Sequence, residues 1–221
     1  MRRRNKIALA VAGVAAGLAA ASALSFDLLY SMFEEPPVLA QLSVGKAAPD
    51  FRLDDVNGRA VSLAGFRGKT VILEWNNPKC PTVKEHYESG TMQRTQAEAA
   101  AAGAVWLTIN SSAKGRQGYM TPAKAKAFAA GQQSRRTAYL LDPEGVVGRS
   151  FGATTTPHMY VINQQGTLVY RGAVSGKPSG TEAGVRGPNN LVLAAISELN
   201  AGKPVSVPVS RPYGCSVKYK A

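Results

Sequence analysis

The chain has 221 residues, of which 45% are hydrophobic and 18% charged, a balance that excludes collagen-like, coiled-coil and wholly disordered proteins. Its two cysteines are too few for a disulfide-rich scaffold or a four-cysteine zinc site. The formal net charge is +12, but the basic residues beyond the first six positions are scattered, so the sequence does not indicate a nucleic-acid-binding surface.

Residues 1–23 have the pattern of an export signal. Four basic residues within the first six positions precede an uncharged, Ala-rich stretch that ends in Ala21-Ser22-Ala23, the small-residue pattern of a cleavage site. An uncleaved membrane anchor is the alternative, since about 18 apolar residues can cross a bilayer weakly. In both cases we expect the rest of the chain to be exported, to the periplasm or cell envelope, with no other membrane contact. Disulfides are common in such compartments.

The remaining chain is expected to form one domain between two extended segments. Residues 24–43 contain Glu34-Glu35-Pro36-Pro37 and are interpreted as a linker, and residues 203–221 contain three prolines and are interpreted as an extended tail carrying Cys215. Between them, in residues 44–202, apolar strand-like runs alternate with helical ones, which is typical of an α/β domain. Strands are predicted at 70–75, 104–110, 137–142, 158–163 and 167–173, and helices at 81–102, 121–130 and 190–200, with a short helical turn before Phe151 and a surface loop at 175–188.

Cys80 is the strongest candidate for chemistry. It follows a predicted buried strand and a short turn, and directly precedes a helix opened by Pro81. Free backbone N–H groups and the positive end of the helix dipole stabilise an anion there, so the position predicts a lowered thiol pKa. Lys79 and Lys84 add positive charge nearby and are predicted to stabilise the thiolate. The alternative interpretation is an inert, half-buried cysteine at the end of a strand.

Cys215 is the only other thiol in the chain. A thiolate that attacks a disulfide or a peroxide needs a second thiol to resolve the product, which would give Cys215 a catalytic role. A structural disulfide that fastens the tail to the domain is the other interpretation, and it would stabilise the fold by about 3–5 kcal/mol. The sequence leaves both interpretations open.

The remaining motifs are weaker. Thr156-Pro157 lies at the start of a predicted strand and is a candidate cis peptide bond. His86 is expected on the surface, because six residues along a helix place it away from Cys80. His158 follows Pro157 and could approach Cys80. A copper site would require a second cysteine where the chain has Lys84, so we expect no metal or other cofactor.

Together these motifs resemble the thioredoxin-fold superfamily, and within it the peroxiredoxin-like branch of the alkyl hydroperoxide reductase and thiol-specific antioxidant (AhpC/TSA, or redoxin) family. The resemblance covers about residues 44–219 and rests on W-N-N-P-K-C-P between strand and helix, T-T-P before a hairpin, and the closing R-P-Y-G-C-S-V-K-Y. It implies a central mixed sheet flanked by helices. It also implies that Cys80 is the active-site thiol, that Pro157 lies in a cis loop facing it, and that the backbone of Thr156 meets a bound partner.

Two departures from the related families bear on the reaction. Val83 stands where a thioredoxin has its second cysteine. Leu73 and Asn77 stand where a true peroxiredoxin has a proline and a threonine before its peroxide-attacking cysteine, so the hydroxyl that binds peroxide is missing. The sequence therefore favours thiol–disulfide exchange over peroxide reduction.

The predicted function is that of a thiol-dependent oxidoreductase. Cys80 attacks the disulfide of a protein or small molecule, Cys215 resolves the product, and an external thiol reductant restores both. One alternative is a thiol peroxidase with antioxidant activity. The other is a catalytically silent thioredoxin-fold module that binds a protein partner, in which a Cys80–Cys215 disulfide is purely structural.

Overall fold

The structure is a computed structural model that describes residues 42–176 and 189–220. The predicted export signal, almost all of the predicted linker and most of the predicted loop at 175–188 lie outside the described residues. Among the residues that are described, no helix is long and apolar enough to cross a membrane.

The core of the domain is a five-stranded mixed sheet with the order β5-β4-β3-β7-β8. Its strands are β3 (Val71–Trp75), β4 (Val105–Asn110), β5 (Ala138–Leu141), β7 (His158–Ile162) and β8 (Leu168–Gly172). The first three run parallel, and β7 is antiparallel to both β3 and β8. The central β3 is buried along its whole length, which explains its nearly continuous apolar sequence. The predicted mixed sheet is thus confirmed.

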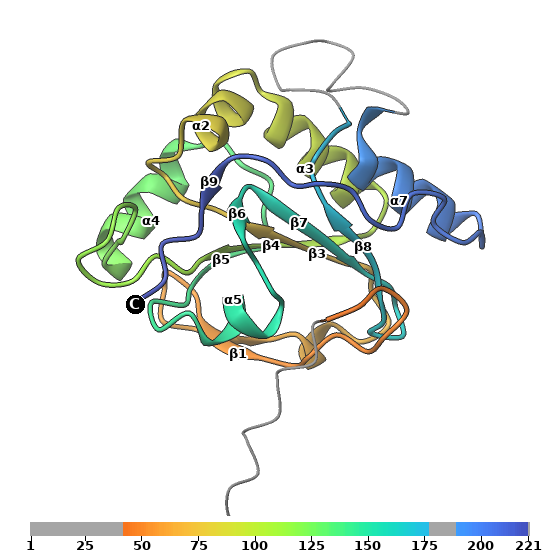
Figure 1. Cartoon of the computed structure of the whole chain (residues 1–221), viewed down its shortest axis with the longest axis horizontal. Helices are drawn as coiled ribbons and strands as arrows, with labels where there is room; N and C mark the ends of the chain where they lie inside the picture. Colours follow the sequence, from red (N-terminus) through yellow and green to blue (C-terminus); the bar gives the residue numbers. More distant parts are fainter. Residues whose placement is uncertain (1–41, 177–188, 221) are drawn as a thin grey trace, which may run out of the picture. The chain divides into compact units, whose positions relative to one another are not determined.

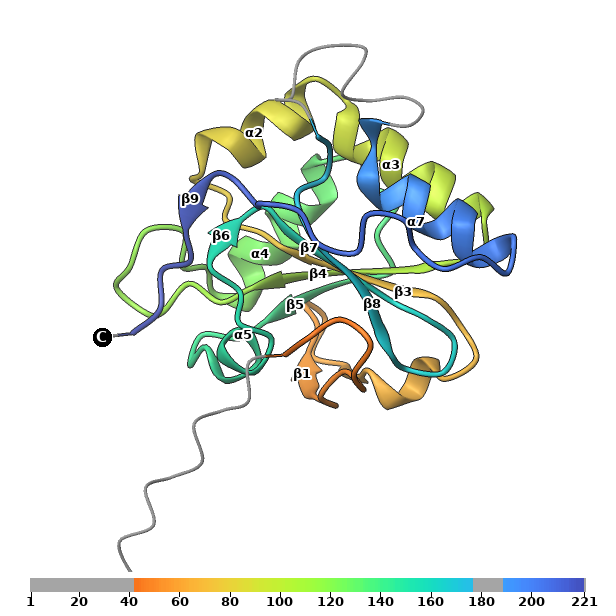
Figure 2. The same ribbon diagram turned by 45° about the vertical axis from the view of Figure 1, so that its right-hand side comes forward.

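Helices flank the sheet, as Figures 1 and 2 show. On one face lie α2 (Pro81–Glu88), α3 (Thr91–Ala101) and α7 (Leu191–Asn200), packed on an apolar cluster that includes Ile72 and Trp106. On the other face Phe151, which ends α5 (Val146–Ser150), packs against Trp75 and Tyr160. The remaining elements are β1 (Arg52–Asp54), β2 (Ala60–Ser62), the 3₁₀ turn η1 (Ala64–Phe66), α4 (Pro122–Gly131), β6 (Thr155–Thr156) and β9 (Cys215–Ser216).

The prediction of a single helix over residues 81–102 is wrong. The helix breaks between α2 and α3 at Ser89 and Gly90, and Gly90 adopts a left-handed conformation with φ of 72°. A glycine accepts this conformation without the steric penalty of a side chain, so the Ser-Gly pair was the signal for the break. The start of α4 agrees with expectation, since the Thr121 hydroxyl accepts a hydrogen bond from the backbone N–H of Lys124.

The C-terminal segment runs extended across the domain (Figure 1). It first lies beside β8, where the backbones of Arg171 and Ser210 are hydrogen-bonded at 3.1 Å. It then reaches β6, with which β9 forms a two-stranded antiparallel pair. In that pair Cys215 stands opposite Thr156, so the tail brings the second cysteine to the loop that precedes β7.

Candidate active site

Cys80 lies at the N-cap of α2, where the chain leaves β3 through a tight turn. Its backbone N–H donates to the carbonyl of Asn77 at 3.0 Å, and its own carbonyl accepts the first helical hydrogen bond, from Lys84. The Asn77 side chain fixes the turn by accepting from the backbone N–H of Lys79 at 2.8 Å and donating to the Gln117 carbonyl at 3.3 Å. The residue in the place of the peroxide-binding threonine is thus bonded to the surrounding backbone.

The loop before β7 meets Cys80 directly. Thr156-Pro157 is a cis peptide bond, which confirms the prediction made for it. The Cys80 thiol donates to the Thr156 carbonyl, with 3.1 Å between sulfur and oxygen. The Thr156 hydroxyl in turn donates to the Cys215 carbonyl at 3.3 Å. The fold therefore gathers the predicted residues Cys80, Cys215, Thr156 and Pro157 in one place.

The two cysteines are both free thiols in this structure, and their acidities differ. Burial raises the pKa of Cys80, but hydrogen bonds to its thiolate outweigh that effect and leave the pKa lowered. The donors are the Cys215 thiol and the backbone N–H groups of Val83 and Cys215, and the Thr156 hydroxyl donates to the sulfur when it turns from the Cys215 carbonyl. Lys79 and Lys84 are both exposed and are not among these donors, so their predicted stabilising role stays a prediction.

Cys215 shows the opposite behaviour. Burial and the neighbouring Cys80 sulfur raise its pKa to about 11, and the positive charge of Lys218 offsets only part of that rise. Of the two thiols, Cys80 therefore loses its proton first, and Cys215 keeps its proton to higher pH. That is the order of acidity needed by an attacking thiol and the thiol that resolves its product.

Two tyrosines hold the tail on either side of Cys215. The Tyr213 ring packs on the imidazole of His86, with 6.1 Å between ring centroids. The Tyr219 hydroxyl donates to the Ala153 carbonyl at 2.8 Å, and the Arg149 guanidinium lies over the Tyr219 ring, 4.5 Å from its centroid. Cys215 is thus positioned by side-chain contacts two residues before it and four residues after it.

The expectation of a surface position for His86 is wrong, since its side chain is 0% exposed. The tail covers this side of α2, and the Tyr213 hydroxyl lies 3.4 Å from Nε2 of His86. Nδ1 has no hydrogen-bond partner within the described part of the chain. Burial lowers the pKa of His86, although Glu85 and Glu74 raise it in part. Helical geometry could not show that the tail returns to cover this side of α2.

His158 does not reach Cys80 through any hydrogen bond in the described residues. Its Nδ1 lies 3.4 Å from the backbone N–H of Thr154 and 3.2 Å from the Tyr160 hydroxyl. Burial, with a smaller contribution from Arg171, lowers its pKa to about 4. The imidazole therefore stays neutral near pH 7 and supports the loop that carries Thr156.

Gly214 allows the tail to approach the cis loop closely. Its φ is 129°, and a Cβ placed there would lie only 2.1 Å from the Thr156 carbonyl oxygen. Any side chain at this position would therefore push the tail away from the carbonyl that also accepts from Cys80. The Gly-Cys dipeptide of the closing motif has a physical reason: the glycine lets the cysteine reach the site.

Glu74 is a buried carboxylate that the sequence analysis did not single out. It lies fully buried on β3 and accepts hydrogen bonds at 2.8–3.4 Å from five side chains, those of Asn76, Tyr87, Gln96, Trp106 and Thr108. Because these donors lie on α2, α3 and β4 and in the turn after β3, Glu74 links β3 to all of these elements. The signal was the single charged residue in the otherwise apolar run T-V-I-L-E-W.

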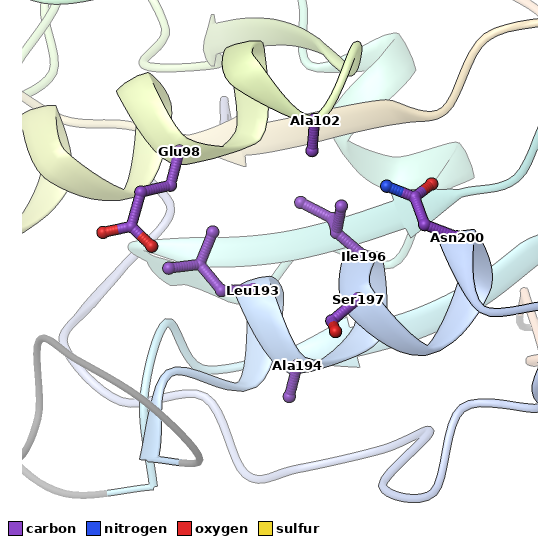
Figure 3. A pocket seen from close by; sticks show the side chains of 7 residues that line it. All are labelled: Glu98, Ala102, Leu193, Ala194, Ile196, Ser197 and Asn200. Atoms are coloured by element: carbon purple, nitrogen blue, oxygen red, sulfur yellow. The ribbon is translucent and has the colours of Figure 1, made fainter.

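A groove of about 510 Å³ lies between α3 and α7 (Figure 3). It is lined by Glu98, Ala102, Leu193, Ala194, Ile196, Ser197 and Asn200. None of these residues belongs to α2, β6 or β9, so the groove is separate from the cysteine pair. It contains no thiol and no histidine, and the candidate active site is the pair itself.

Comparisons with known proteins identify the family and the fold. The AhpC/TSA family matches residues 44–171, a span that includes Cys80, Thr156 and Pro157 but not Cys215. No curated protein matches the chain. An uncharacterized conserved protein from Geobacillus kaustophilus has 25% identity and a TM-score of 0.72, over 82% of this chain and 94% of that protein.

Two further solved structures share the fold. A hypothetical protein from Sinorhizobium meliloti 1021 has 24% identity and a TM-score of 0.72, over 82% of this chain and 97% of its own. A putative thiol:disulfide interchange protein DsbE from Chlorobium tepidum has 24% identity and a TM-score of 0.50, over 59% of this chain and 85% of its own. With its thioredoxin-like fold and its match over more than half of the sequence, this chain belongs to the AhpC/TSA family of redox proteins.

Proposed function

We propose that the protein is a thiol–disulfide oxidoreductase in which Cys80 attacks a substrate disulfide and Cys215 resolves the mixed disulfide. One observation carries the proposal: two thiols are in contact at the start of α2, and the pKa of one is lowered while the pKa of the other is raised. The Cys80 thiolate attacks one sulfur of the substrate disulfide. A Cys80–substrate bond forms, the substrate S–S bond breaks, and the departing thiolate takes a proton from the solvent.

Resolution follows from the same geometry. Part of the rise in the pKa of Cys215 comes from the Cys80 sulfur, and this part disappears once Cys80 is bonded to the substrate. Cys215 then loses its proton more readily and attacks the Cys80 sulfur. The products are a Cys80–Cys215 disulfide and the second substrate thiol. An external thiol reductant would return both cysteines to the reduced form.

Peroxide is a poorer substrate in this proposal. A hydroxyl at position 77 is missing, and the Asn77 side chain is already bonded to Lys79 and Gln117. Loss of a single preorganised donor of this kind reduces a rate by about 10²–10³-fold. Pro81 also removes one N–H group from the start of α2.

Stopped-flow kinetics of the reduced protein with a model disulfide and with hydrogen peroxide test the proposal. We expect the disulfide to react faster, in a reaction that Cys80→Ser abolishes. A peroxide rate of true peroxiredoxin magnitude, lost in Cys80→Ser and accompanied by Cys80–Cys215 bond formation, would favour the peroxidase. No reaction with either compound, together with a reduction potential below about −300 mV, would favour a structural disulfide.

We also propose that the protein is exported and that its mature form begins near Leu24. This rests on the basic start, the apolar stretch and the Ala21-Ser22-Ala23 pattern of the sequence. Mass measurement of the native protein from fractionated cells tests it. An intact Met1 in the cytosolic fraction would contradict export.

A further inference from the structure

Cys80 cannot meet a substrate in the arrangement that the structure shows. Its side chain is 0% exposed, and its sulfur contacts Thr156 on one side and Cys215 on another. Thiol–disulfide exchange requires the attacking sulfur to touch a sulfur of the substrate. One of the segments around Cys80 must therefore move before the reaction begins.

The segment that can move is residues 213–219, here called the strap. The other segments around Cys80 are α2, which packs on the sheet, and the β6 loop, which leads through Pro157 directly into the fully buried strand β7. The strap carries only the two-residue strand β9, and both Gly214 and Ser216 are exposed. Its backbone makes few bonds to the domain, among them Val217 N–H to the Thr154 carbonyl at 3.0 Å and Ala113 N–H to the Lys218 carbonyl at 2.8 Å. Segments with few packed contacts open at the lowest free energy.

We propose that the strap is an internal occupant of the place where a substrate polypeptide binds, and that it must leave β6 before a partner reaches Cys80. The inference rests on the proposed exchange reaction at Cys80 and adds a regulated state to it. With the strap docked the sulfur is covered, and with the strap released the edge of β6 and the sulfur are both open.

The bonds that the strap makes indicate the chemistry of the partner. When the strap leaves, the Thr154 carbonyl and the Ala113 N–H lose their backbone partners. A partner with its own extended backbone can pair with β6 and replace the bond to Thr154, and the same backbone can continue to Ala113, as the strap does. A small disulfide without a peptide backbone leaves both groups unpaired. The favoured partner is therefore an extended polypeptide segment that carries its disulfide at the position now held by Cys215.

Release of the strap also changes the chemistry of Cys80. The Cys215 thiol and N–H are donors to the Cys80 thiolate, and both belong to the strap. Only the Val83 N–H and the Thr156 hydroxyl remain when it leaves. Release also exposes the sulfur and so removes part of the burial that raises its pKa, which opposes the loss of the two donors. Access to the sulfur is therefore the property that the strap controls.

Variants that loosen the strap test the proposal when Cys80 is the only thiol, so all are made in a Cys215→Ser background. Gly214→Ala places a methyl group against the Thr156 carbonyl. Gly202→Ala is its matched control, because Gly202 also has positive φ and lies at the start of the tail, but an added Cβ meets nothing within 4 Å. Tyr219→Ala removes the second anchor, with Val207→Ala, 43% exposed, as its control.

The measurement is the rate of iodoacetamide labelling of Cys80 as a function of pH. For Gly214→Ala and Tyr219→Ala we expect the high-pH plateau of the labelling rate to rise roughly tenfold, as for a proportional gain in the open population. Both controls should match the background protein. Circular dichroism and thermal unfolding identify any variant that fails to fold. An unchanged plateau in two folded strap variants would refute the proposal that the strap covers Cys80.

Addition of a separate peptide tests the partner class. A synthetic peptide of residues 211–219 with serine in place of Cys215 should slow labelling of Cys80 in the Gly214→Ala protein, because its own glycine still fits against Thr156. A scrambled peptide of the same composition should have no effect. If both peptides slowed the labelling of Cys80 equally, or if neither slowed it, the proposal that β6 accepts an extended polypeptide would be contradicted.

These measurements do not depend on turnover. If labelling behaves as expected but the reduced protein exchanges no disulfide, the proposed function is wrong and the proposal for the strap is supported. If disulfide exchange occurs while the strap variants label like their controls, the proposal for the strap is wrong and the proposed function is supported.

Discussion

The start of α2 and the tail segment around β9 each hold one cysteine, but they are built in different ways. Cys80 is fixed by the end of β3, the turn bonded by Asn77 and the first turn of α2, all parts of the core. Cys215 is held by a two-residue strand and by contacts at Tyr213 and Tyr219. The comparison indicates a division of roles: the acidic sulfur is rigidly placed, and the less acidic one lies on a segment that can leave.

The largest expected effect comes from exchanging each cysteine for serine. Cys80→Ser should reduce the rate of disulfide reduction by at least about 10³-fold, because it removes the attacking sulfur. Cys215→Ser should still attack once and then accumulate a mixed disulfide, because the resolving thiol is missing. Mass spectrometry after addition of a model disulfide distinguishes the two. If Cys215→Ser formed no adduct while Cys80→Ser did, the assignment of the attacking sulfur would be reversed.

Titration of the two thiols gives the next largest effect. The pKa of Cys80 is lowered and that of Cys215 is raised to about 11, so their thiolate populations at neutral pH should differ by more than about 100-fold. Alkylation of the reduced protein across pH, followed by peptide mapping, measures each midpoint separately. Two coincident midpoints near the value for free cysteine would show that the surroundings do not distinguish the two sulfurs.

The core side of the site should also be sensitive to acid through His158. Burial lowers the pKa of its imidazole to about 4, so between about pH 6.5 and pH 4 the unfolded chain binds a proton that the folded chain does not. Its contribution to stability is present above pH 6.5 and is lost as the pH falls toward 4. At pH 5 the loss should be about 2 kcal/mol, and His158→Gln, which does not titrate, should escape it. Urea unfolding of both proteins at pH 7.5 and pH 5 measures the difference. An equal loss in both would assign the acid sensitivity to other groups.

The same contrast between core and tail separates what sequence reasoning reached from what it missed. Position within a strand–turn–helix motif was enough to predict Cys80 at a helix start, because that placement follows from local sequence. The cis bond before Pro157 was a candidate from its place at the start of a strand and was implied by the family resemblance. The burial of His86 could not be predicted, since the residue that covers it, Tyr213, is 127 positions away in the chain. Periodic local patterns predict the strands of the sheet and the helices on it. The tail has only a two-residue strand, and its docking depends on side-chain contacts that leave no periodic pattern in the sequence.

The smallest expected effect concerns one hydrogen bond of the strap. Tyr219→Phe removes the hydroxyl that donates to the Ala153 carbonyl but keeps the ring beneath the Arg149 guanidinium. A single hydrogen bond of this kind contributes about 1 kcal/mol, so the open population of the strap should rise roughly fivefold. The global free energy of unfolding should change by no more than this, because α2 and the sheet do not depend on the bond.

Hydrogen exchange separates the two effects of Tyr219→Phe. The backbone N–H of Val217, a strap residue, donates to the Thr154 carbonyl and should exchange faster in the variant. The amides of β3 should keep their protection. The matched variant is Tyr119→Phe, since Tyr119 lies outside the strap. If the β3 amides lost protection in parallel with Val217, the tail would open only with the whole domain. The two regions would then be one cooperative unit, and the separation between a fixed and a displaceable cysteine would not hold.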